Sequence, residues 1–416
     1  MKKQLLYFVD HSFPFSSDGY AVRTHAVAQG FVKNGYRVTV INRFGRVFSV
    51  PGIDANNVEP HYRIDGVNYL FFKSPSGKPP SAKYFSEWLE GATQLVKELI
   101  STYQPGQILV ASNWENAWPV KLACEDLGKP YIYEVRGFWE LSRATKEPKW
   151  IESEDFKCAK TREADVANSA ARVLTLNKLM QRTLVERGVS IKKIQLLPNS
   201  LSTLPAIPEL GKERERLATE VKARYGVTQP FVLAYIGTFN HYEGLHLIIR
   251  ALKELPEDVG LLLIGGSMAR GHDEKDVSDP IREELMVEAK AQGVMNRVYF
   301  TGRIPPHEVS VLYSAIDVVV NTRISTPVTD LVSALKPIET AAHAVPMVLS
   351  DIGANKDIND EFTYPNPLFK QGDSHDLACK VRDVLSQIPE YRRQAKANRE
   401  FVKHHRLFPT LINMLF

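Results

Sequence analysis

Lys336 and Glu339 are a cation and a carboxylate that stand beyond the polar stretch after a β-branched run at Val318 to Val320. The run predicts a buried parallel strand, and the polar stretch after it predicts a loop and then a helix with Ser333 as its N-cap. Both charged residues would then lie in the first turn of that helix, at the carboxyl end of a strand. Doubly wound α/β folds bind ligands at this edge, and free N–H groups at a helix N-terminus favour phosphate. The alternative is that Glu339 only complements the helix dipole.

A second charged group stands at the end of another expected strand, which begins at Tyr131. Glu134, Arg136 and Glu140 follow there, and Trp139 stands beside the last of them. Charge that packs between a buried strand and aromatic rings is costly unless it is paired or binds a ligand. Arg136 and Glu134 are therefore candidate catalytic residues. The alternative is that the three charges form an ion network that satisfies itself.

The first expected strand ends at Val9, in a loop that contains Gly19. This loop matches neither the GxGxxG fingerprint of dinucleotide binding nor the GxxxxGK[ST] fingerprint of P-loops. A helix is expected after it, with Asp18 as its N-cap and with Arg23 and His25 on its solvated face. A second strand then completes a βαβ unit.

Length and composition fit a globular chain with two or three domains and 416 residues. The formal net charge is only +4, so nucleic acid is not an expected partner. No apolar run approaches the ~20 residues that a membrane-spanning helix needs. We expect the N-terminus to pass directly into a strand rather than a signal peptide, and three scattered cysteines fit a reducing compartment. We therefore expect a cytoplasmic location.

Several motifs carry a family resemblance: the helix start Leu335-Lys-Pro-Ile-Glu-Thr-Ala-Ala, the turn from Gly237 to Gly244, and Pro198-Asn199. Together they resemble the retaining glycosyltransferases of family GT4, which have the GT-B fold. The stretch Glu134-Val-Arg-Gly-Phe-Trp-Glu resembles the branch of that family that assembles polysaccharide and lipopolysaccharide. The resemblance covers nearly the whole chain.

The resemblance and the alternation of strand and helix patterns imply an α/β chain of GT-B architecture. Such a chain has two Rossmann-like domains with a cleft between them. We place an N-terminal, acceptor-side domain at residues 1–204 and a C-terminal, donor-side domain at residues 205–401. A C-terminal helix at about residues 402–416 would cross back to the first domain.

Carried over by position, the resemblance implies a set of donor-binding residues. Glu339 would bind the ribose hydroxyls of a nucleotide-diphosphate sugar, and the amides of Ala334 and Leu335 would hold its diphosphate. Gly19 falls in the glycine loop beneath the donor phosphates and sugar, and Arg303 falls in a turn that faces the base.

Two cations that usually grip the diphosphate in this family are replaced here by Thr238 and Glu243. Their loss removes charge-assisted hydrogen bonds worth about 1.5–3 kcal/mol each. Other cations at the same site would have to compensate, and the candidates are Lys336, Arg323, Arg303 and Arg270. We favour Lys336, because the Tyr-Glu-Gly-Leu form of the turn resembles a variant that is paired with the Leu-Lys-Pro form of the helix.

The implied reaction moves a sugar from a nucleotide-diphosphate sugar to a hydroxyl of a glycan or glycolipid acceptor near Arg136, in cell-surface polysaccharide biosynthesis. Retention would come from front-face displacement, in which no side chain acts as a nucleophile and the leaving diphosphate assists the acceptor hydroxyl. No resident cofactor is implied. No metal is implied either, because no Asp-x-Asp stands at an expected strand end.

Two other functions remain open. A catalytically silent GT-B scaffold for a polysaccharide-assembly complex is suggested by Thr238, Glu243 and Leu331, the last of which stands where the family often has a second glutamate. A GT-B sugar epimerase would need acid and base carboxylates, for which the sequence offers no clear pair.

A lipid-linked acceptor would bring the protein to the inner face of a membrane. Basic and aromatic residues alternate around Lys73, Lys78 and Lys83, and such a segment can lie on an anionic surface or bind an acceptor. The alternative is a solvated loop that leads into a buried helix.

Overall fold

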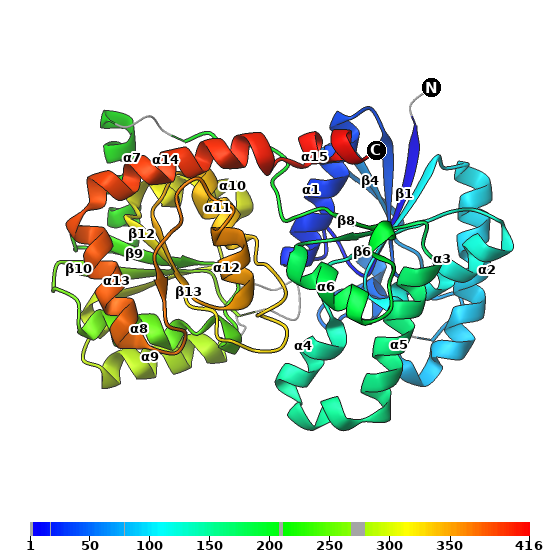
Figure 1. Cartoon of the computed structure of the whole chain (residues 1–416), viewed down its shortest axis with the longest axis horizontal. Helices are drawn as coiled ribbons and strands as arrows, with labels where there is room; N and C mark the ends of the chain where they lie inside the picture. The colour runs from blue at the N-terminus through cyan, green and yellow to red at the C-terminus, as the bar shows by residue number, and fades with distance from the viewer. Residues whose placement is uncertain (1–2, 17, 79, 208–210, 268–278) are drawn as a thin grey trace. The chain divides into compact units, whose positions relative to one another are not determined.

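The computed structural model describes residues 3–416 apart from residues 17, 79, 208–210 and 268–278, so Arg270 lies outside the described residues. The chain divides into two α/β units, each with a sheet flanked by helices (Figure 1). Unit 1 holds the described residues up to 202 together with residues 407–416, and unit 2 holds those between 203 and 406. The expected α/β class is confirmed. In the described part of the chain, no helix is both long and apolar enough to cross a membrane.

Unit 1 is built on eight strands. They are β1 Gln4–Val9, β2 Arg37–Asn42, β3 His61–Ile64, β4 Val67–Leu70, β5 Gln107–Ala111, β6 Ile132–Val135, β7 Arg172–Thr175 and β8 Ile194–Leu196. Their order in the sheet is β3-β4-β2-β1-β5-β6-β7-β8. All neighbours are parallel except β3 and β4, which pair antiparallel.

The helices of unit 1 are α1 Gly19–Lys33, α2 Phe85–Tyr103, α3 Trp114–Asp126, α4 Trp139–Lys146, α5 Glu154–Ser169, α6 Lys178–Glu186 and α15 Phe408–Leu415. One core lies between the sheet and helices α1 and α15. Alternate residues of β1 point to this side, because successive side chains of a strand face opposite ways. They are Leu5, Tyr7 and Val9, all fully buried.

Helix α15 returns the chain to unit 1 by packing on α1. A Cβ at Gly30 would lie 2.6 Å from Cδ1 of Ile412 and 2.9 Å from Cβ of Phe408, so only glycine allows this close approach. The returning C-terminal helix is confirmed, but the helix expected at about residues 402–416 is interrupted at Arg406, and only the part after it, α15, belongs to unit 1. The preceding helix ends at His405, and α15 starts anew with a proline in its first turn.

Unit 2 is built on six parallel strands: β9 Phe231–Ile236, β10 Val259–Ile264, β11 Val298–Gly302, β12 Val318–Asn321, β13 Met347–Ser350 and β14 Leu368–Phe369. Their order is β11-β10-β9-β12-β13-β14. The helices are α7 Lys212–Tyr225, α8 Leu245–Lys253, α9 Pro280–Ala291, α10 Pro306–Leu312, α11 Lys336–Ala342, α12 Gly353–Asn359, α13 Ser374–Ser386 and α14 Ile388–His405. Helices α8, α9 and α13 cover one face of the sheet with an apolar core.

Two helix caps were predicted from the sequence. Asp18 caps α1 as expected, because its Oδ1 accepts a hydrogen bond from the Ala21 N–H at 2.9 Å. The prediction for Ser333 is wrong, since α11 begins at Lys336 and no side chain caps it. A turn held by hydrogen bonds between Thr326 and Thr329 precedes the helix, and the irregular chain after that turn delays the start of α11.

Each sheet has a point at which its strand order reverses. In unit 1, β1 lies between β2 and β5, and in unit 2, β9 lies between β10 and β12. Open α/β sheets bind ligands beyond the carboxyl ends of the strands at such a switch point. The loops after β9 and β12 in unit 2, and those after β1 and β5 in unit 1, are therefore the places to look for sites.

Candidate functional site

The switch point of unit 2 brings two loops together. Residues after β9 include Gly237 and Glu243, and residues after β12 lead through Arg323 to Lys336 at the start of α11. The strands are in register, with Val318 of β12 opposite Leu233 of β9. The sequence pattern placed the charged helix start at a strand edge, and the fold sets it against the loop of the neighbouring strand.

Glu243 and two cations form the centre of this site. Nζ of Lys336 lies 3.0 Å from Oε1 of Glu243, and Nε of Arg323 lies 3.6 Å from the same oxygen. Glu243 is only 3% exposed. Burial raises the pKa of this carboxyl, but the charges of Lys336 and Arg323 outweigh burial and hold the pKa below its usual value. The acid is thus a carboxylate that is neutralised from two sides.

Gly237 makes room for the lysine. Its φ of +145° lies in a region that favours glycine, and a Cβ there would stand 2.5 Å from Cε of Lys336. The ammonium also lies 5.2 Å from the ring centroid of Tyr235, whose hydroxyl donates to the carbonyl of Thr238 at 2.9 Å. Thr238 therefore stands beside the site and contributes its backbone to the packing around Lys336.

Glu339 occupies the first turn of α11 and is half-buried. Burial raises the pKa of its carboxyl, while Lys336 opposes that shift. Among the described residues, none donates a hydrogen bond to this carboxylate. Its backbone carbonyl accepts a bond from Nδ1 of His343 at 2.7 Å, and the His343 ring stacks on Tyr313 with centroids 3.8 Å apart. The end of the short helix is thus fixed while the Glu339 side chain keeps its hydrogen-bonding capacity.

The other predicted donor residues lie at the same edge of the sheet in different settings. The backbone N–H groups of Ala334 and Leu335 make no hydrogen bond within the described part of the chain. Arg323 is largely buried and donates from Nη1 to the carbonyl of Val332 at 2.9 Å. Arg303 is exposed at the end of β11, two strands away from β9, and donates to the carbonyl of Ser267.

Sequence reasoning missed one polar group at this edge. Asn321 ends β12, is 2% exposed and lines a small cavity with Lys336 and Tyr235. Neither atom of its side-chain amide has a hydrogen-bond partner among the described residues. An amide at the end of an apolar run gives no local signal, so only the fold shows that it faces the site.

In unit 1, Glu134 and Arg136 are both buried and are bonded to each other. Nε and Nη2 of Arg136 lie 3.0 and 2.9 Å from Oε2 of Glu134. Arg23 takes the other carboxylate oxygen, with Nε at 2.9 Å, and Tyr7 donates its hydroxyl to Glu134. Burial raises the pKa of Glu134, and Arg23 opposes that shift.

The remaining N–H groups of Arg136 are also used inside unit 1. Nη1 donates to Oγ1 of Thr24 at 2.7 Å and to the carbonyl of Tyr20 at 3.2 Å, and Nη2 donates to the Tyr7 hydroxyl. Burial lowers the pKa of Arg136 to about 9. Glu140 belongs to a separate pair, with Arg187 at 2.6 Å. The catalytic role of Arg136 and Glu134 stays a prediction; their geometry is that of a buried ion network.

Arg23 and His25 were expected on the solvated face of α1, and this prediction is wrong. Both are buried, at 4% and 9% exposure. Arg23 reaches the carboxylate of Glu134 on β6, and His25 bonds through Nδ1 to the hydroxyl of Tyr69 on β4. These partners lie on distant strands, so the local pattern of the helix could not reveal them.

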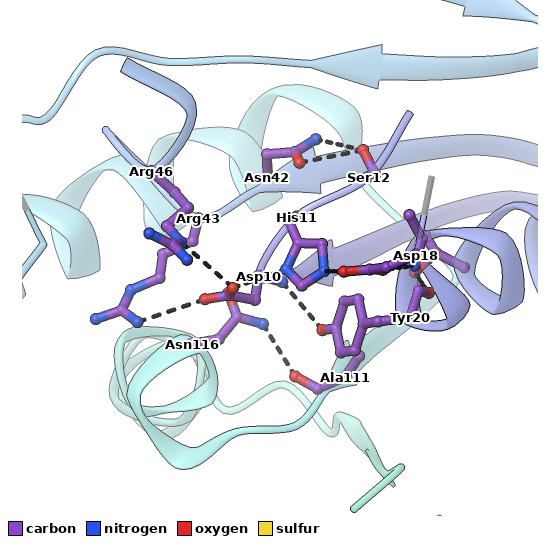
Figure 2. Close-up of polar contacts among 12 residues, drawn as sticks. Asp10, His11, Ser12, Asp18, Tyr20, Asn42, Arg43, Arg46, Ala111 and Asn116 are labelled. Carbon is purple, nitrogen blue, oxygen red and sulfur yellow. Dashed lines mark hydrogen bonds and ion pairs between the residues drawn. The ribbon is translucent and has the colours of Figure 1, made fainter. Parts of the chain in front are cut away.

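A further charged group follows β1, beside Gly19, and Figure 2 shows how it is arranged. His11 lies between two carboxylates, with Nδ1 at 2.9 Å from Asp10 and Nε2 at 2.8 Å from Asp18. Its ring stacks on Tyr20 with centroids 4.5 Å apart. Burial lowers the pKa of His11, but the two carboxylates outweigh burial and raise it to about 9. A neutral imidazole has only one N–H, so an arrangement that satisfies both carboxylates requires the imidazolium.

This cluster ties the loop after β1 to its surroundings. The Tyr20 hydroxyl accepts a hydrogen bond from the Asp10 N–H at 3.0 Å (Figure 2). It also donates to the carbonyl of Ser112, just after β5, at 2.9 Å. Gly19, the first residue of α1, is exposed at the edge of this cluster. Sequence reasoning gave His11 no role, although both of its carboxylate partners, Asp10 and Asp18, lie in the same segment.

Comparison with known families gives two matches that together span most of the chain. Residues 18–200 match the glycosyl transferase 4-like domain. Residues 219–401 match the glycosyl transferases group 1 family. The first match falls in unit 1 and the second in unit 2.

Two glycosyltransferases are similar to this chain in sequence. The chain is 23% identical over 384 residues to an uncharacterised glycosyltransferase of Methanocaldococcus jannaschii, covering 88% of this chain and 85% of that protein. It is 22% identical over 239 residues to the 2-deoxystreptamine glucosyltransferase of Streptomyces kanamyceticus. That second alignment spans only 56% of the relative's length.

Solved structures share the fold at low identity. Sucrose-phosphate synthase of Thermosynechococcus elongatus has a TM-score of 0.74 at 18% identity, with 100% of this chain and 98% of that chain covered. HepE of Anabaena, in complex with UDP and glucose, has a TM-score of 0.72 at 16% identity and the same coverage. WaaG, a glycosyltransferase of lipopolysaccharide biosynthesis, has a TM-score of 0.64 at 13% identity, with 99% of each chain covered. With this fold and a glycosyltransferase domain matched in each unit, the chain belongs to the GT4-like glycosyltransferases of the GT-B fold.

Proposed function

We propose that the protein is a retaining glycosyltransferase that moves a sugar from a nucleotide-diphosphate sugar to a hydroxyl of a glycan or glycolipid in cell-surface polysaccharide biosynthesis. The observation that carries the proposal is the cluster at the switch point of unit 2. There Lys336 lies beside Glu243 and Arg323, one helical turn before the half-buried Glu339. Cations of this kind attract phosphate, and a carboxylate with unused oxygens accepts bonds from hydroxyl groups.

Each donor group would meet a matching part of this cluster. The diphosphate carries the negative charge that Lys336 and Arg323 can bind, in place of the cations missing at Thr238 and Glu243. The ribose carries two hydroxyls for the Glu339 carboxylate. The similar HepE structures contain UDP, and one contains UDP-glucose, so uridine nucleotides are the first donors to try.

Retention is proposed through front-face displacement. The bond between the anomeric carbon and the diphosphate oxygen breaks, the acceptor oxygen bonds to that carbon on the same face, and the leaving diphosphate takes the acceptor proton. The charge that develops on the diphosphate is the one that a preorganised cation stabilises, and Lys336 is the candidate that we favour. Arg136 and Glu134 would act from unit 1 by holding the ends of β1 and β6 in place for the acceptor.

The setting of the reaction is part of the proposal. The described cysteines Cys124, Cys158 and Cys379 are unpaired, which suits a reducing cytoplasm. A lipid-linked acceptor would bring the protein to the inner face of a membrane. Lys78 and Lys83 lie over the ring of Tyr84, at 4.9 and 5.1 Å, and this basic and aromatic patch is where such a contact would form.

The test is a transfer assay with UDP, GDP, dTDP and ADP sugars and a panel of saccharide and lipid-linked acceptors. We expect one donor to release its nucleoside diphosphate only when an acceptor is present, with the anomeric configuration kept in the product by NMR. Glu339→Ala should abolish release, while Glu288→Gln, which changes a carboxylate on α9, should not. An inverted product would contradict the retaining mechanism.

The second candidate is a silent scaffold in a polysaccharide-assembly complex. Thr238 and Glu243 favour it, because neither can bind a phosphate as a cation would. Donor binding without release under any acceptor, or no binding at all, would support this candidate over the transferase.

A further inference from the structure

Glu243 is an anion at a site that is proposed to bind an anionic ligand. A carboxylate close to a diphosphate repels it, and burying a carboxylate is costly unless cations accompany it. This residue is nevertheless 3% exposed at the switch point of unit 2. A carboxylate at this position therefore needs a function whose benefit exceeds the cost of repelling the diphosphate.

We propose that Glu243 is a positioning residue of the donor site, whose buried carboxylate holds Lys336 and Arg323 where the diphosphate binds and does not itself touch the donor. This inference rests on the proposed function, because it assigns a task to a residue of that same site. Glu243 stands where the family usually has a phosphate-binding cation. In this inference it holds Lys336, the cation that replaces the missing one.

The backbone around Glu243 is fixed independently of its carboxylate. The Glu243 carbonyl accepts a bond from Oγ1 of Thr322 at 2.7 Å, and the Tyr242 carbonyl accepts one from the Ile324 N–H at 2.8 Å. Both bonds join the loop after β9 to the loop after β12. The side chain therefore starts from a rigid turn, the short 3-10 helix His241–Glu243, and can hold its partners at a defined place.

Burial orders the pair from inside to outside. The side chain of Glu243 is 5% exposed and that of Lys336 is 21% exposed, so the carboxylate lies beneath the ammonium. An ammonium has three N–H groups, and one of them points to Glu243. The other two have no hydrogen-bond partner among the described residues and are available to a ligand. Two cations contact Glu243 here, so this carboxylate offsets only one of their two positive charges.

Gly237 and Tyr235 also contact the side chain of Lys336. The side chain of Lys336 crosses over Gly237, where a Cβ would collide with it, and its ammonium lies over the Tyr235 ring. These contacts orient the stem, and among the described residues Glu243 is the one that forms an ion pair with the charged end. Without its carboxylate, the ammonium would lose this ion pair and sample other rotamers.

A double-mutant cycle on the donor dissociation constant tests this inference. The variants are Glu243→Gln, Lys336→Met and the double mutant, and the ligand is the donor that wild type binds best in titration calorimetry. We expect Glu243→Gln to weaken binding about tenfold or more, and to weaken it by a clearly smaller factor when Lys336 is already Met, because only Arg323 is then left for the carboxylate to hold. Glu243→Asp should recover part of the affinity, because it restores the charge.

Glu288→Gln is the matched control. It removes the partner of Arg250, an ion pair between α8 and α9 with Nε and Oε1 2.7 Å apart, and should leave donor affinity unchanged. Thermal unfolding of each variant checks that it is folded. A Glu243→Gln protein that binds the donor as well as wild type, or more tightly, overturns the inference while the proposed function stands. If wild type binds no nucleotide sugar, the proposed function fails and the inference fails with it.

Discussion

Nζ of Lys336 lies 3.0 Å from Oε1 of Glu243, and this contact joins the first residue of α11 to the turn after β9. The two residues are 93 positions apart and meet because β9 and β12 are neighbours at the switch point of unit 2. A cation on one loop is thereby held by an anion on the other.

Gly237→Ala should weaken donor binding about tenfold or more, because the new Cβ would stand 2.5 Å from Cε of Lys336 and displace the ammonium. Titration calorimetry with the preferred donor measures the change. Gly293→Ala is the control, since Gly293 also has a positive φ, of +74°, but a Cβ there meets nothing within 4 Å. Equal donor affinities in Gly237→Ala and wild type would show that the position of the Lys336 side chain over Gly237 does not affect donor binding.

His11 should make the stability of unit 1 depend on pH. Its pKa is raised from 6.5 to about 9 in the fold, so the proton is bound more tightly in the folded state than in the unfolded state. The stabilisation is complete below about pH 6.5 and is lost as the pH rises through about 9. His11→Gln removes this contribution, so its deficit in unfolding free energy relative to wild type should shrink between these pH values.

Urea unfolding at a series of pH values measures this deficit. Asp10, Asp18, Arg43 and Arg46 face the imidazole cluster, and all of them remain in the variant. His404→Gln, on the exposed end of α14, is the control and should differ from wild type by the same small amount throughout. If the unfolding free energy of His11→Gln changes with pH in parallel with that of wild type over this range, His11 is not held as an imidazolium between Asp10 and Asp18.

Glu134→Gln should destabilise the protein by about 3–5 kcal/mol, because it leaves Arg23 and Arg136 buried without their shared anion. Glu125→Gln, which breaks an exposed pair with Lys121 on α3, should cost less than about 1 kcal/mol. Unfolding in urea compares the two. If Glu134→Gln lowers the unfolding free energy no more than the control does, the ion network of Glu134 does not stabilise the strands that it joins.

Much of the fold follows from local sequence patterns. Apolar runs predict the strands, Asp18 is recognisable as a cap because its bond to Ala21 is local, and the place of Lys336 at a strand edge follows from the order of strand, loop and helix. Ser333 failed as a cap because a turn built by two threonines comes first. A local sequence pattern predicts a helix cap correctly only where no other local hydrogen bond competes with it.

The partners of the site residues could not be read in this way. Arg23 meets Glu134 across 111 positions, and His11 is clamped from both ends of a loop that looks unremarkable as sequence. Helical periodicity placed Arg23 outward, but the cost of burial is met by a carboxylate on a distant strand. The motifs suggested Lys336 as the replacement for a missing cation, but its ion pair with Glu243 is seen only in the fold.

The central claim is that unit 2 binds a nucleotide-diphosphate sugar through Glu339 and Lys336. Titration of wild type, Glu339→Ala and Glu288→Gln with UDP, GDP, dTDP and ADP sugars tests it most directly. We predict that one donor binds wild type and Glu288→Gln alike and binds Glu339→Ala at least about tenfold more weakly, since charged hydrogen bonds to hydroxyls are worth about 1.5–3 kcal/mol. Failure of every donor to bind wild type, or equal binding by Glu339→Ala, would contradict the claim.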